Sequence, residues 1–109
     1  MAYGKLGLSI PAANTNTVIY TVPSNCIYAE LTINILNPDS ADITVDVALA
    51  SSSSPASNEY IEKGTIIPAS GGILERTNLI CSPGENVVVK SSLATSVVRV
   101  SGKELAYIG

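Results

Sequence analysis

The sequence predicts an all-β protein: an antiparallel β-sandwich of about seven to nine strands, immunoglobulin-like or jelly roll in arrangement. Its composition is the first indication, because 12 Ile, 10 Val and 9 Leu stand beside 22 Ser plus Thr, with no Phe or Trp. Branched aliphatic and small hydroxyl residues suit a pleated, half-buried surface. The second indication is period-2 alternation in short runs, and the third is a turn signal about every 8–12 residues. At 109 residues, the chain is expected to form a single domain over residues 1–109.

Four runs in the N-terminal half have the alternation of strands. They are residues 5–10, 17–22, 26–36 and 42–50. The last two runs are joined by the turn at residues 37–42, so they are predicted to pair as an antiparallel hairpin. The residues expected to face the core are Leu6, Leu8 and Ile10; Val18, Tyr20 and Val22; Ile27, Ala29, Leu31, Ile33 and Ile35; and Ile43, Val45, Val47 and Leu49.

The C-terminal half reads as shorter strands between turns. A short strand is expected around Tyr60–Ile61, followed by a break at Gly64 and an apolar pair at Ile66–Ile67. Further strands are expected at residues 73–81, 86–92 and 96–104, and the tail 105–109 either pairs as a last strand or stays free.

Two glycine sites in this half predict tight turns. Gly71-Gly72 precedes the strand at 73–81, and Pro83-Gly84 follows it. Pro83-Gly84 fits the central positions of a type II turn, where glycine adopts positive φ at little cost. No helix follows Gly71-Gly72, so a phosphate-binding role is not expected.

The residue types argue against an enzyme. The chain has no histidine, which is the commonest general base and a common metal ligand. Asp39 and Asp42, with the amide of Asn37, offer oxygens for a weak Ca²⁺ site, but turn capping explains them more simply. No catalytic residue, metal or cofactor is therefore predicted.

Charge and hydropathy argue against some classes of partner and location. The net charge of −3 comes without a basic stripe, so nucleic-acid binding is not expected. No apolar run reaches the roughly 18 residues of a membrane span, and the N-terminus lacks the pattern of a secretory signal. Synthesis in a cytoplasm is expected. Cys26 and Cys81 are accordingly interpreted as two buried thiols, with one disulfide as the alternative.

Two surface hypotheses follow from particular side chains. Glu75 and Arg76 alternate, so one faces outward; Arg76 either hydrogen-bonds backbone carbonyls at a sheet edge or contacts a partner subunit. Tyr28 and Tyr60 are the candidate platform for a carbohydrate-binding surface, although tyrosine is equally common in half-buried strands.

Several segments together resemble a known family: small all-β virion structural proteins of tailed bacteriophages, especially cyanophages and other aquatic phages. The matching segments are IPAANTNTVIYTVPSN (10–25), ELTINILNPDSADITVDVALA (30–50), NEYIEKGTIIPASGGILERTNLI (58–80), PGENVVVKSS (83–92) and VVRVSGKE (97–104). Where this family is expected to have glycine after Glu-Arg-Thr, the chain has Asn78, which tolerates left-handed backbone and would preserve a turn there.

The resemblance implies a non-enzymatic virion component, above all a capsid decoration or cement protein bound to the outer head. A tail, neck or fibre-associated subunit is the alternative in the same class, and a surface carbohydrate-binding module is the alternative from another. The implied location is the virion. The implied partners are the major capsid protein or another virion protein, and further copies of the chain, a trimer being one arrangement.

Assembly contacts are expected at two terminal segments, 1–9 and 105–109. These either extend as arms onto a neighbour or form edge strands of their own sandwich. The candidate assembly residues are Tyr3, Leu6, Leu8, Arg76, Tyr107 and Ile108.

Overall fold

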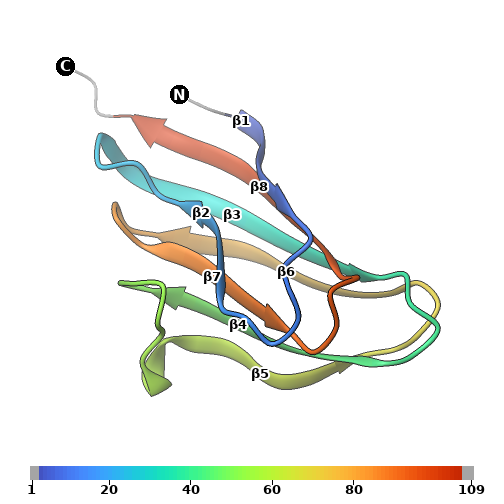
Figure 1. Ribbon diagram of the computed structural model, residues 1–109. Helices are drawn as coiled ribbons and strands as arrows, with labels where there is room; N and C mark the ends of the chain where they lie inside the picture. The colour runs from blue at the N-terminus through green and yellow to red at the C-terminus, as the bar shows by residue number, and fades with distance from the viewer. Residues whose placement is uncertain (1–2, 107–109) are drawn as a thin grey trace.

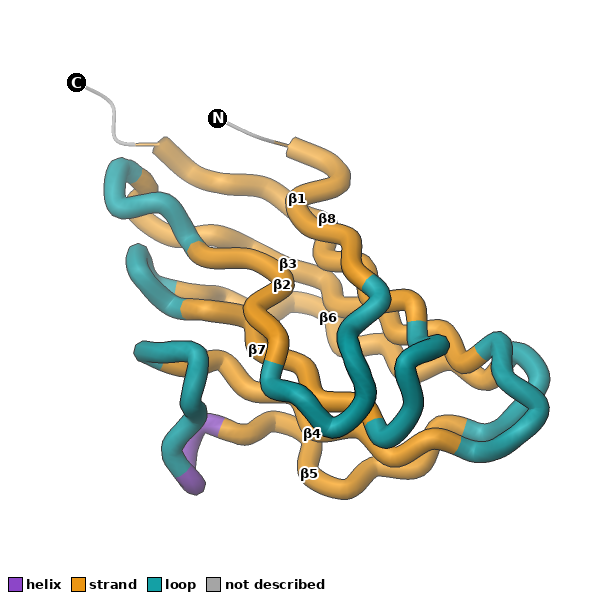
Figure 2. The backbone as a smooth tube through the Cα atoms, viewed as in Figure 1, coloured by secondary structure: helices purple, strands orange, loops and turns teal. Residues whose placement is uncertain are grey.

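The computed structural model describes residues 3–106, which form eight β-strands and one 3-10 turn (Figures 1 and 2). Tyr107 and Ile108 lie outside the described residues. The elements are β1 (Tyr3–Ser9), β2 (Thr17–Thr21), β3 (Cys26–Asn37), β4 (Ile43–Ala50), the 3-10 turn η1 (Ser57–Glu59), β5 (Tyr60–Ile67), β6 (Gly72–Cys81), β7 (Asn86–Ser91) and β8 (Val97–Ala106).

The strands form two four-stranded antiparallel sheets, confirming the predicted β-sandwich. Sheet A has the order β1-β8-β3-β6 and sheet B the order β2-β7-β4-β5. The pairs β1–β8, β2–β7, β3–β6 and β4–β5 are nested around the β4–β5 connection. Pairs β3–β8 and β4–β7 then join them into sheets. This order is that of a jelly roll, one of the two predicted arrangements.

The predicted hairpin of residues 26–36 with 42–50 is wrong, because β3 belongs to sheet A and β4 to sheet B. The connecting turn is a corner between sheets, held by the side chain of Asn37, which is fully buried. Its Nδ2 donates to the carbonyls of Ala41, Ile67 and Pro68 at 3.0, 3.0 and 3.1 Å, and its Oδ1 accepts the N–H of Asp39 at 3.0 Å. The alternation of apolar and polar residues predicts which face of a strand is buried, but it does not predict which strand pairs with it.

The core between the sheets is aliphatic, as the composition requires. Its buried residues come from both sheets and include Leu31, Ile33 and Ile35 of β3 and Val45 and Val47 of β4. A second, smaller cluster lies on the outer face of sheet B, where Tyr60 packs against Ala48, Ala50 and Val88.

β-Bulges shift several predicted faces. Register shifts occur between Lys5 and Gly7, between Val18 and Tyr20, and between Cys26 and Tyr28. Each bulge inserts one residue and reverses the alternation on one side of it. Leu6 therefore packs against the core, whereas Leu8, Ile10, Val18 and Ile27, all predicted to face inward, are exposed.

The predicted turn at Pro83-Gly84 is confirmed, whereas Gly64 and Asn78 lie within strands. Gly84 has φ 86° and the N–H of Glu85 donates to Ser82 O at 3.1 Å, as in a type II turn. Gly64, predicted as a break, has φ 64° inside the continuous strand β5. Asn78 has φ 58°, but it lies in a bulge of β6 opposite β3 and not in a turn.

Candidate functional site

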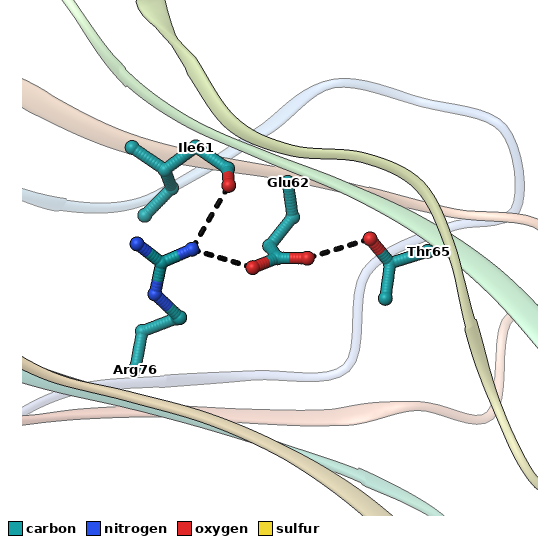
Figure 3. Close-up of polar contacts among 4 residues, drawn as sticks. All are labelled: Ile61, Glu62, Thr65 and Arg76. Atoms are coloured by element: carbon teal, nitrogen blue, oxygen red, sulfur yellow. Dashed lines mark hydrogen bonds and ion pairs between the residues drawn. The ribbon is translucent and has the colours of Figure 1, made fainter.

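One open side of the sandwich, between the edge strands β5 and β6, is closed by Arg76 (Figure 3). Its Nη1 donates to the backbone carbonyl of Ile61 at 2.9 Å and to the Glu62 carboxylate at 2.5 Å. Glu62 also accepts the hydroxyl of Thr65 at 2.6 Å, and this hydrogen bond and Arg76 together lower the pKa of Glu62. Arg76 thus binds a backbone carbonyl at a sheet edge, while Glu75 faces outward and accepts a hydrogen bond from Asn34.

The opposite side is closed by direct approach of β1 to β2. A Cβ on Gly7 would lie 2.5 Å from the carbonyl oxygen of Ile19, so only glycine allows this distance. Nearby, the buried Tyr20 of sheet B donates its hydroxyl to Glu104 of sheet A at 2.5 Å. Burial and this carboxylate raise the pKa of Tyr20. Residues 3–9 are therefore an edge strand of their own sandwich and not a free arm.

The outer face of sheet A, called the assembly face below, carries most of the exposed apolar side chains. Five of the nine large hydrophobic residues exposed in the described part of the chain lie on it. They are Tyr3 (84% exposed), Leu8 (57%), Ile73 (59%), Ile80 (59%) and Leu105 (39%). Exposed apolar groups gathered on one face mark an interaction surface.

The register arranges the assembly face in rows that cross all four strands. One row runs Tyr3, Lys103, Glu30, Ile80 from β1 through β8 and β3 to β6, and a second runs Leu8, Arg99, Asn34, Glu75. Each row places an apolar residue on β1 and a cation on β8.

Charges on the assembly face are divided between its two halves. The basic residues Lys5, Arg99 and Lys103 lie on β1 and β8, and the acidic residues Glu30 and Glu75 lie on β3 and β6. The ion pairs within the described residues are Lys63–Asp46 and Arg76–Glu62. None of the five charged residues of the assembly face belongs to these two pairs, and Glu75 accepts a hydrogen bond from Asn34.

A hollow of about 310 Å³ opens on this face. Glycine is required beside it, because Gly102 has φ 143° and a Cβ there would lie 1.9 Å from Glu30 O. The hollow is lined by Tyr3, Gly4, Glu30, Leu31, Thr32, Asn78, Gly102 and Lys103.

The predicted assembly residues are thus dispersed. Tyr3 and Leu8 are on the assembly face, Leu6 points to the core, and Arg76 is held within the chain. Sequence reasoning missed Ile73 and Ile80, although both alternate with the inward residues Leu74 and Cys81. That alternation was the signal available for them.

Tyr28 and Tyr60 do not form the proposed carbohydrate platform. Tyr28 pairs with Leu105 on the outer face of sheet A, whereas Tyr60 pairs with Ala48 on the outer face of sheet B. The ring of Tyr60 packs on the small apolar cluster there and lies 4.3 Å from the ammonium of Lys63. The two rings are therefore on opposite sides of the sandwich.

The carboxylates of Asp39 and Asp42, considered above as calcium ligands, instead accept backbone hydrogen bonds at the corners of the fold. Asp39 accepts the N–H of Ala41 at 3.0 Å, and Asp42 accepts the N–H of Ala69 at 2.9 Å. Over residues 3–106, no group of three or more His, Cys, Asp or Glu is placed to hold a metal ion.

Cys26 and Cys81 are free and buried, in agreement with the expectation of two buried thiols. Both side chains face the core, and burial raises the pKa of Cys26 and raises that of Cys81 to about 11. Neither thiol is therefore activated as a nucleophile.

No protein-family model, curated protein or solved structure matches the chain. Within residues 3–106, no helix is long and apolar enough to cross a membrane. The molecule is a jelly-roll sandwich with both sides closed and one mixed apolar and charged face.

Proposed function

We propose that this protein is a non-enzymatic structural subunit of a bacteriophage virion: a capsid decoration protein that binds the outer head. The observation that carries the proposal is the concentration of exposed apolar residues on the assembly face. A surface of this kind serves association rather than chemistry. The resemblance of most of the chain to small virion proteins of tailed phages supports the same function.

The body of the molecule suits a subunit that is added to a particle. Jelly rolls occur in viral capsid proteins and in lectins, so the fold agrees with this function but does not select it. Gly7 and Arg76 close the two sides of the sandwich. A closed body presents its partner with a rigid face, which limits the entropy lost on binding. The partner in this proposal is the major capsid protein or another virion protein, beside further copies of the chain.

Immunogold labelling of intact phage particles with an antibody to this chain tests the proposal. Gold spread over the head supports decoration. Gold confined to the tail or neck moves the protein to the alternative position in the virion. No gold on any particle, with the chain also missing from purified virions by mass spectrometry, overturns the virion function.

A further inference from the structure

We propose that the assembly face binds a second copy of this chain, face to face, in a twofold-symmetric dimer. This inference rests on the proposed function and assigns the assembly face to one of its two kinds of partner, a further copy of the chain; its test in solution is independent of the virion. A twofold interface must be self-complementary, because each patch meets its own copy. The arrangement of the rows, the charges and the hollow meets this requirement.

The charges are complementary under one particular rotation. A twofold axis parallel to the strands, between β8 and β3, places β8 of one copy over β3 of the other and β1 over β6. Lys103 then faces Glu30 of the second copy and Arg99 faces Asn34, while Glu75 of the second copy lies over Leu8 and beside Arg99. Each contact occurs twice. An axis across the strands would instead place the cations of β8 against one another, and like charges oppose association.

Two apolar residues at the edges of the face, Tyr3 and Ile80, meet under the same rotation. Tyr3 at the β1 edge faces Ile80 at the β6 edge of the second copy, since both belong to the row that contains Lys103 and Glu30. Tyr3 is 84% exposed and is the most prominent apolar group of this face. The hollow extends to Asn78 on β6, so the tyrosine of one copy has a recess of the other to enter. Stacked sheets pack in this way with strands within about 30° of each other.

Paired charge reversals test the proposal. Lys103→Glu leaves acidic groups at both positions 30 and 103, and Glu30→Lys leaves basic groups at both. Each variant alone is expected to weaken dimerisation by about tenfold or more, since the twofold dimer loses both copies of the Lys103–Glu30 pair and one such pair between subunits is already worth about that. Mixing the two variants is expected to restore a dimer that contains one copy of each.

The mixture separates contacts between chains from contacts within a chain. Positions 30 and 103 are also neighbours within the sheet of one chain. In each variant the residues at these two positions have charges of the same sign, so they repel each other within that chain. Mixing leaves this repulsion unchanged, so only pairing between two chains restores association. Sedimentation equilibrium gives the mass, and fluorescence transfer between differently labelled copies identifies the mixed dimer. Lys63→Glu, which makes the same charge change on sheet B, is the control and should leave the dimer unchanged.

Circular dichroism establishes that each variant is folded. A dimer that is lost in the single variants and recovered in the mixture supports the proposal. A monomer at every concentration, a trimer, or a dimer indifferent to both reversals overturns it. Gold labelling of particles is a separate result. If the head is labelled but the chain is a monomer in solution, the dimer proposal is wrong and the virion function stands. If the chain is a dimer but no particle is labelled, the virion function is wrong and the dimer stands.

Discussion

Asn37 shows how much a single buried amide contributes to this fold. Its side chain joins the corner after β3 to the end of β5 through three backbone carbonyls and one backbone N–H. The two hydrogens of Nδ2 serve three acceptors, so one hydrogen is shared. Because this site has no access to solvent, water does not replace the amide when it is removed.

Asn37→Ala is expected to lower the free energy of unfolding by about 3 kcal/mol, since each buried polar group left without a partner costs about 1–3 kcal/mol. Urea unfolding followed by circular dichroism measures the loss. Asn34→Ala is the matched control, because that amide lies on the outer face and donates to Glu75 at 3.2 Å; a loss below about 1 kcal/mol is expected. Equal losses in the two variants would show that burial of Asn37 is not decisive.

Glu62 makes part of the stability depend on pH. Thr65 and then Arg76 lower its pKa below the ordinary value of 4.5. A carboxyl group with a lowered folded pKa stabilises the protein fully above its unfolded pKa, and this contribution is lost as pH falls through the folded value. Glu62→Gln should therefore be less stable than the wild type near neutral pH, and the difference should shrink below about pH 4.5.

Urea unfolding of both proteins at a series of pH values measures this difference. The stability difference between wild type and Glu62→Gln should shrink over a narrower pH range when Thr65 is replaced by Val in both proteins. The Thr65→Val change removes the hydrogen bond that is the largest cause of the lowered pKa of Glu62. A difference between wild type and Glu62→Gln that is constant down to about pH 3 would contradict the assignment.

At the scale of elements, the bulge in β6 depends on the backbone of Asn78. Its φ of 58° is left-handed, a conformation that asparagine and glycine accept and β-branched residues resist. Asn78→Val is expected to lose about 1–2 kcal/mol of stability, whereas Asn78→Gly should stay within about 1 kcal/mol of the wild type. Thermal or urea unfolding measures both.

The neighbouring position provides the control for this element. Thr77 is also exposed and lies in the same bulge, and its φ is not positive. Thr77→Val should therefore be close to neutral. If both valine variants lose the same stability, loss of polarity at the bulge is responsible and not the backbone conformation.

The bulges also explain which elements were predictable. In β4 the uninterrupted alternation identifies Ile43, Val45 and Val47 as core residues, and all three are buried. In β1 the same argument fails for Leu8, because the insertion at Leu6 reverses the faces. The sequence of a short alternating run does not reveal a bulge, because one extra apolar residue can be assigned to either face of the strand.

At the scale of the whole molecule, strand pairing was beyond the sequence. The pair β1–β8 joins Tyr3 to Lys103 and the pair β3–β8 joins Glu30 to Lys103, and no local pattern specifies partners so distant along the chain. The assembly face exists only through these pairings. For that reason sequence reasoning found Tyr3 and Leu8 separately, placed Tyr28 and Tyr60 on one surface, and did not find the row that ends at Ile80.

The nested pairing predicts that the sandwich opens as one unit, and the two thiols report on it. Cys26 on β3 and Cys81 on β6 are 0% and 1% exposed, respectively. Both are expected to react with a thiol reagent at the same slow rate, because each becomes accessible only on global unfolding. Ser82→Cys supplies an exposed thiol beside Cys81 and should react at once. Mass spectrometry of peptides follows each site with time. If Cys81 reacts well before Cys26, β6 opens locally and the cooperative unit is smaller than the sandwich; equal rates that rise together with urea establish a single unit.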